Sequence, residues 1–144
     1  MVIVNDMPNG QEARAEELEG KNYFTIMGRL PGLNDVINAC RSHWSNGARL
    51  KRQTEADIIW QIKAATGRGV LHPATGPVRV EFEWHESNKR RDLDNIYSAK
   101  KFVLDAMQQA GIIANDNRKH VVGLHDDIVD DKQDFVVVTI HPAS

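Results

Sequence analysis

The segment from residue 96 to residue 111 constrains the fold more than any other part of the chain. Its apolar residues recur every three or four positions, which is the period of a helix with one buried face. These residues are Ile96, Ala99, Val103, Ala106, Met107 and Ala110. Gly111 follows at the place where many helices end with a glycine. We therefore expect one helix from about Asp94 to Ala110, packed on a hydrophobic layer.

A β-sheet is the expected partner of this helix. Apolar and charged residues alternate through residues 78–84, the pattern of a half-buried strand. We expect further strands at 22–27, 120–124 and 135–141, helices near 35–43 and 50–65, a loop at 66–77, and an acidic hairpin-like loop at 125–134. The order of these elements is typical of an α+β fold, a small mixed sheet with helices packed on one face in a single domain.

Charge is distributed unevenly along the chain. Residues 1–20 hold five acids against one base, and we expect a disordered acidic tail there, followed by one domain over 21–144. Residues 121–144 also hold five acids against one base, whereas residues 21–120 hold 16 bases against 10 acids. A basic middle fits a polyanionic partner, although a solvated surface explains the charge equally well.

Several classes of protein are disfavoured. Cys40 is the one cysteine, which excludes an intramolecular disulfide framework, and we expect it to be a small buried hydrophobe. No apolar run reaches the roughly 20 residues of a membrane helix, and the N-terminus lacks a signal-peptide pattern, so we expect a cytoplasmic protein without membrane contact. Trp44 and Trp60 have the chemistry to stack on bases, but tryptophans in helical segments are more often core residues, and we expect that here.

The segment KRRDLDN, residues 89–95, is the most unusual part of the sequence. Asp92 and Asp94 lie at the expected start of the helix, where Asp94 could serve simply as its cap. Two carboxylates this close repel each other, so holding both ionised calls for a neighbouring cation or a metal. Asp116 adds a third carboxylate in the polar turn after the helix. Calcium-loop and zinc spacings are absent, and hard oxygen ligands indicate Mg²⁺, with Mn²⁺ as an alternative.

Helical geometry distinguishes the two lysines at positions 100 and 101. On a continuous helix, Lys101 follows Asp94 by seven residues and shares its face, whereas Lys100 is rotated by about 120°. Lys101 can therefore reach toward the aspartates. A simple ion pair between Lys101 and Asp105 is the structural alternative, and both arrangements are compatible.

The run RRDLDNIYSAKKFVLDAMQQAGIIANDN resembles the core of the RusA-like Holliday-junction resolvases, phage-derived endonucleases that cut four-way DNA junctions. The upstream strand and its LPGLN turn, residues 22–34, are also similar to that family, so the resemblance covers about residues 22–141. It implies that Asp92, Asp94 and Asp116 bind the divalent metal. It also implies a catalytic lysine, which is Lys101 when the match is counted back from Asp105. Three extra residues near Tyr97–Ala99 depart from the family pattern, and a forward count from Asp94 would reach Ser98 instead.

The resemblance implies an Mg²⁺-dependent endodeoxyribonuclease that works as a homodimer on four-way junctions, in DNA repair and recombination. Two other functions remain open, a nuclease selective for flaps or forks and an inactive junction-binding protein. We expect the DNA backbone to be contacted by cations and one amide, namely Lys89, Arg90, Arg91, Lys100, Arg118, Lys119 and Asn34. For Asn34 we favour a helix cap slightly over a DNA contact.

Overall fold

The computed structural model describes residues 16–143, and a mixed four-stranded sheet is its centre. The strands are β1 (Tyr23–Met27), β2 (Val78–Glu86), β3 (Val121–Asp130) and β4 (Phe135–Pro142), in the spatial order β1-β4-β2-β3. β4 pairs antiparallel with both β1 and β2, whereas β2 and β3 are parallel. The single-domain α+β arrangement is therefore confirmed.

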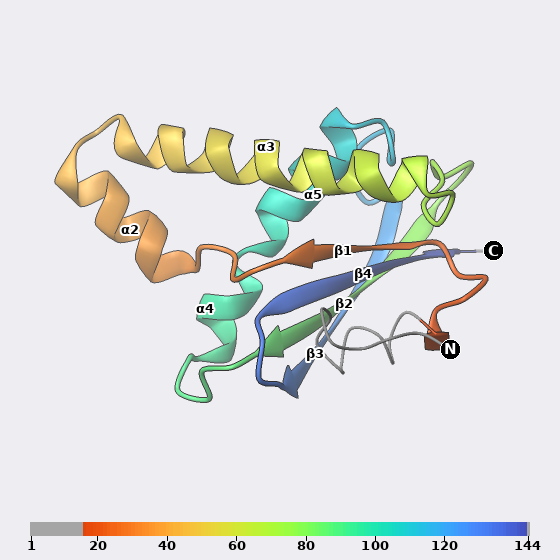
Figure 1. Cartoon of the computed structure of the whole chain (residues 1–144). Coiled ribbons are helices and arrows are strands. Elements are labelled where there is room, and N and C mark those ends of the chain that lie inside the picture. Colours follow the sequence, from red (N-terminus) through yellow and green to blue (C-terminus); the bar gives the residue numbers. More distant parts are fainter. Residues whose placement is uncertain (1–15, 144) are drawn as a thin grey trace.

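The helices α2 (Leu33–Ser42), α3 (Asn46–Gly67), α4 (Leu93–Tyr97) and α5 (Lys100–Gln109) accompany the sheet in the described part of the chain. α3 and α5 lie over one face, and their apolar side chains join those of the strands in one core (Figure 1). The fully buried residues of this core include Phe82 from the sheet and, from the two helices, Ile58, Ile62, Val103 and Met107. None of the helices among residues 16–143 is long and apolar enough to cross a membrane.

The run of apolar residues in β4 reflects burial on both faces of that strand. Val136 and Val138 point into the helical core, while Phe135 and Val137 pack on the opposite face with Leu18. A strand covered on both sides loses the alternation of an exposed one. Leu18 lies within the expected acidic tail, which therefore contacts the domain at its end, while residues 1–15 lie outside the described part of the chain.

Two expected elements differ in the structure. The helix expected over residues 94–110 is divided into α4 and α5 by a turn at Ser98–Ala99. The N–H groups of Ala99 and Phe102 donate to carbonyls three residues earlier, a tighter pattern than that of an α-helix. The acidic segment expected as a loop instead continues β3 to Asp130. Within the described sheet β3 pairs only with β2, and exposed acids are compatible with such an edge strand.

The expectation of buried positions at Trp44, Trp60 and Cys40 is wrong. Trp44 is 85% exposed and Trp60 is 74% exposed, and Cys40 is also exposed. All three lie on α3, on α2 or on their connection, and the described part of α2 contains no buried residue. The two tryptophans are thus surface groups that the core does not explain.

The connection from β2 through α4 and α5 to β3 decides where the motif residues lie. The register pairs Val78 with Val121 at one end and Glu86 with Asp130 at the other. Asp92 and Asp94 follow the C-terminal end of β2, whereas Asp116 precedes the N-terminal end of β3. Because the two strands are parallel, these segments leave and enter the sheet at opposite ends (Figure 1).

Candidate active site

The two motif aspartates lie at the start of α4. Asp92 occupies the N-cap position, but its carboxylate makes no capping hydrogen bond. Asp94 lies in the first turn, where its Oδ1 accepts the N–H of Asn95 at 2.9 Å. The structural alternative, in which Asp94 caps the helix, is therefore not observed. Both aspartates are exposed, and the carboxylate of Asp92 is not used to cap the helix.

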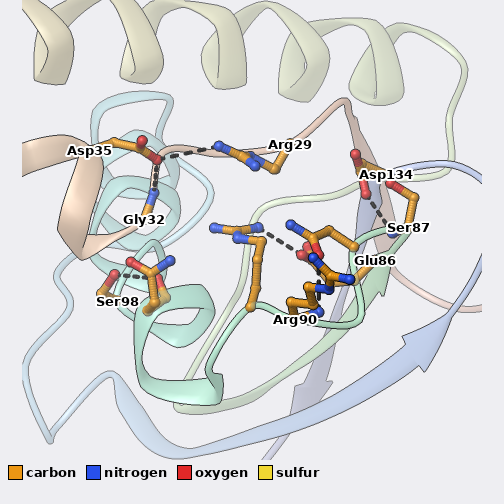
Figure 2. A network of polar contacts seen from close by, with 11 residues as sticks. Arg29, Gly32, Asp35, Glu86, Ser87, Arg90, Ser98 and Asp134 are labelled. Carbon is orange, nitrogen blue, oxygen red and sulfur yellow. Dashed lines mark hydrogen bonds and ion pairs between the residues drawn. The ribbon is translucent and has the colours of Figure 1, made fainter.

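The LPGLN turn packs directly against this motif, although the two are far apart in sequence. The N–H of Asn34 donates to Oδ1 of Asn95 at 3.0 Å. A Cβ added to Gly32 would lie 2.5 Å from the same Oδ1, so only glycine leaves room for Asn95. Gly32 is itself the N-cap of α2, and its N–H donates to Asp35 at 2.8 Å (Figure 2). Asn34 thus lies inside the helix, and the cap expected there is wrong.

Gly32→Ala should destabilise the protein by about 1–3 kcal/mol, because the new methyl group overlaps an amide that is already held by Asn34. Gly67→Ala is the matched control, since an added Cβ there meets nothing within 4 Å. Urea denaturation of both variants measures the difference. Equal stability of Gly32→Ala and the wild type would show that the turn moves freely relative to Asn95.

The cations around the motif have different environments. Lys89 and Arg90 are exposed. Arg91 instead donates to Glu86 at 2.7 Å, and both side chains are almost completely buried, so this guanidinium supports the fold. Arg29 is a further cation near the motif that the sequence did not indicate. It pairs with Asp35 of α2 at 3.7 Å (Figure 2).

Lys101 links two carboxylates at the start of α5. Its Nζ donates to Asp116 at 2.8 Å and lies 3.0 Å from Asp105, so the expected pair with Asp105 is present together with a longer-range contact. The hydrogen bond from Lys101 holds the pKa of Asp116 below its ordinary value. The bonds to Asp116 and Asp105 correspondingly raise the pKa of Lys101. The ammonium is therefore charged and the carboxylate ionised at neutral pH.

This ionic cluster extends to α3 through residues that sequence reasoning missed. Lys51 lies 3.7 Å from Asp105 and 3.9 Å from Glu55. Glu55 is buried, and its Oε1 accepts the side-chain N–H of Gln109 at 2.6 Å, while its Oε2 has no hydrogen-bond partner. The sequence offered no signal for these residues, because the burial of Glu55 depends on how α3 packs against α5.

The Lys101–Asp116 contact predicts a measurable titration. In Lys101→Met the pKa of Asp116 should rise toward that of an ordinary aspartate, because the hydrogen bond and the positive charge are both removed. A pKa that is depressed in the folded state stabilises the protein above the ordinary aspartate pKa, and this contribution is lost as the pH falls through the depressed value. Carboxyl ¹³C NMR follows the group directly. Lys119→Met is the control, and an unchanged Asp116 pKa in Lys101→Met would contradict the contact.

Lys100 points away from Asp116 and toward strand β3. Its ammonium hydrogen-bonds Asp126 of β3, whose other oxygen accepts the indole N–H of Trp84 at 2.9 Å. Lys100 also lies 5.3 Å from the ring centre of Tyr97. Burial raises the pKa of the Tyr97 hydroxyl, and the charges of Asp126 and Asp127 add to this effect. The ammonium of Lys100 is thus engaged with the sheet, a structural role that the sequence did not indicate.

The three motif aspartates are not assembled into one ligand set. Across residues 16–143 no group of three or more Asp, Glu, His or Cys side chains lies close enough to hold a metal ion. The topology explains this, because the segments that carry Asp92 and Asp116 are connected to opposite ends of the β2–β3 pair. Arg118 and Lys119 are exposed on the Asp116 side, so the expected basic residues are divided between the two ends.

No protein-family model and no curated protein matches this chain.

Proposed function

We propose that this chain is a metal-dependent endodeoxyribonuclease that resolves four-way DNA junctions by paired symmetric nicks during DNA repair or recombination. The observation that carries the proposal is the hydrogen bond from Lys101 to Asp116. The resemblance to the RusA-like family assigns both residues to one site, although they come from a helix and a separate turn. A second supporting feature is the Asp92 carboxylate, which is exposed and does not cap its helix.

The residues of the site suit phosphodiester hydrolysis. The reaction places further negative charge on a phosphate that is already anionic, so a nearby ammonium stabilises its transition state. Lys101 supplies that charge, and the contacts with Asp105 and Asp116 position it. Lys89, Arg90, Arg118 and Lys119 are exposed cations that bind the backbone independently of base sequence. A four-way junction is nearly two-fold symmetric, so paired cuts fit a homodimer.

The donor chemistry of Asp92, Asp94 and Asp116 fits Mg²⁺ or Mn²⁺, because all three ligands are hard carboxylate oxygens. When bound, such an ion lowers the pKa of a coordinated water and neutralises developing charge. Because Asp92 and Asp116 lie in segments connected to opposite ends of the β2–β3 pair, binding by all three aspartates requires them to come closer together than in this structure. Calorimetric titration of the DNA-free protein with Mg²⁺ tests this binding independently of cleavage.

Cleavage should depend on Mg²⁺ or Mn²⁺ and disappear in EDTA. Ca²⁺ should fail to support cleavage even where it supports binding, because it is larger and acidifies its bound water less. The assay is nicking of an end-labelled junction after dialysis against each ion. Efficient cutting in EDTA would contradict the metal-dependent reaction.

The substrate is tested with a synthetic mobile four-way junction beside a linear duplex of the same sequence. Each strand is labelled in turn, and the wild type is compared with Asp92→Asn as the inactive control. Paired, symmetric nicks on the junction alone support resolution. Equal cutting of the linear duplex would indicate a general nuclease, and cutting of flaps or forks in preference to the junction would indicate the other structure-selective class.

A further inference from the structure

The hairpin formed by α2 and the first turns of α3 extends beyond the end of the sheet (Figure 1). In the described structure α2 has no buried residue, so the sheet core does not account for this hairpin. An exposed helix that contributes no buried residue to the core offers a surface for a partner.

Local contacts connect the residues at the tip of this hairpin. The hydroxyl of Ser45 lies 2.7 Å from Nδ1 of His43, and the side-chain amide of Asn46 donates to Ser42 at 2.9 Å. A Cβ at Gly47 would lie 2.4 Å from the sulfur of Cys40, so glycine allows the two helices to approach closely at the turn. The tip is therefore preorganised, which lowers the entropic cost of binding through it.

The preorganised tip presents an aromatic ring to solvent. The side chain of Trp44 is 85% exposed. The ring of His43 stacks beside it, with 5.6 Å between the two ring centres. Exposing an indole in water is unfavourable unless a partner covers it, and a flat ring held at a projecting tip can stack on another flat ring.

The charge of the hairpin favours a polyanion as that partner. Residues 36–54 contain Arg41, Arg49, Lys51 and Arg52 and no aspartate or glutamate. Neither Arg41, Arg49 nor Arg52 pairs with a carboxylate of residues 16–143, and all three are exposed. Two copies of this surface would repel each other, whereas a nucleic acid would neutralise it.

We propose that Trp44 stacks on a base that is unstacked at the branch point of a DNA substrate, while Arg41, Arg49 and Arg52 hold the neighbouring phosphates. This inference rests on the proposed function for the branched substrate. Stacking of a base on an aromatic side chain is sequence-tolerant, because every base presents a flat face. The hairpin then recognises an opened DNA structure, separately from the residues that cut it.

The test uses Trp44→Ala and Trp44→Phe, with Trp60→Ala as the matched control for an exposed tryptophan on the same pair of helices. Fluorescence anisotropy in Ca²⁺ buffer measures binding to the four-way junction, to a linear duplex and to a single strand. Trp44→Ala should weaken junction and single-strand binding about 10- to 100-fold and change duplex binding less than about threefold. Trp44→Phe should retain most of the affinity, and Trp60→Ala should bind like the wild type.

Other outcomes overturn the inference. If Trp44→Ala binds the junction with wild-type affinity, Trp44 does not stack on a base. If its affinity for the linear duplex falls as much as its affinity for the junction, Trp44 contacts DNA without recognising an unstacked base. A monomer–dimer equilibrium that shifts in Trp44→Ala, with DNA affinity unchanged, would assign the surface to a second copy of the chain. If the wild type lacks any preference for the junction, the proposed function fails, but the single-strand measurement still decides whether Trp44 stacks. Thermal melts confirm that each variant is folded.

Discussion

Asp92→Asn, Asp94→Asn and Asp116→Asn should each reduce junction cleavage by about 10³-fold while junction binding is retained or becomes tighter. Asparagine preserves the size of the side chain but removes a negative charge. The loss of that charge weakens the hold on a divalent cation and also reduces repulsion of the phosphate backbone. All three aspartates lie at or near the surface, so the fold should tolerate the substitutions.

Nicking and mobility-shift assays on the same samples separate catalysis from binding. Asp57→Asn, an exposed aspartate on α3, is the control for a general change in charge. Near-normal cutting by any one of the three motif variants would remove that residue from the proposed metal ligands. Loss of both binding and cleavage would instead indicate a folding defect, which circular dichroism detects.

Lys101→Ala should lower the single-turnover cleavage rate by roughly 10²–10³-fold with little effect on stability. Its side chain is 67% exposed, and after the substitution Asp105 keeps its ion pair with Lys51 while Asp116 stays partly exposed. Lys100→Ala should behave differently. Its removal leaves Asp126 largely buried with one hydrogen bond from Trp84 in place of two, which should cost about 1–3 kcal/mol of stability.

Single-turnover rates at saturating protein measure the chemical step, and urea denaturation measures the stability of the same variants. Lys100→Met is a useful companion, because it keeps an apolar side chain of similar length and removes the ammonium. A folded Lys100→Ala variant with a lost chemical step, beside an active Lys101→Ala variant, would reverse the assignment. The match counted back from Asp105 would then be in the wrong register.

The break between α4 and α5 shows why the angular argument for the lysines was incomplete. Ile96, Ala99 and Val103 are buried on both sides of the break, so the apolar period continues through it. Hydrophobic spacing predicts which side chains are buried. It does not reveal a local change from hydrogen bonds to the carbonyl four residues earlier to bonds to the carbonyl three residues earlier. The separation of Lys100 from Lys101 was nevertheless predicted, because adjacent residues on any helix point in different directions.

The sequence by itself determined the elements whose local pattern and burial agree: the alternating strand β2, the strands β1 and β4, and the amphipathic residues of α5. Only the tertiary structure decided which polar groups meet, because ion pairs and close contacts depend on long-range packing. Arg91 is buried against Glu86, Gly32 makes room for Asn95, and Lys101 reaches Asp116. The exposure of Trp44 was likewise a tertiary result, since an apolar side chain on a helix looks the same in sequence whether or not a core lies beside it.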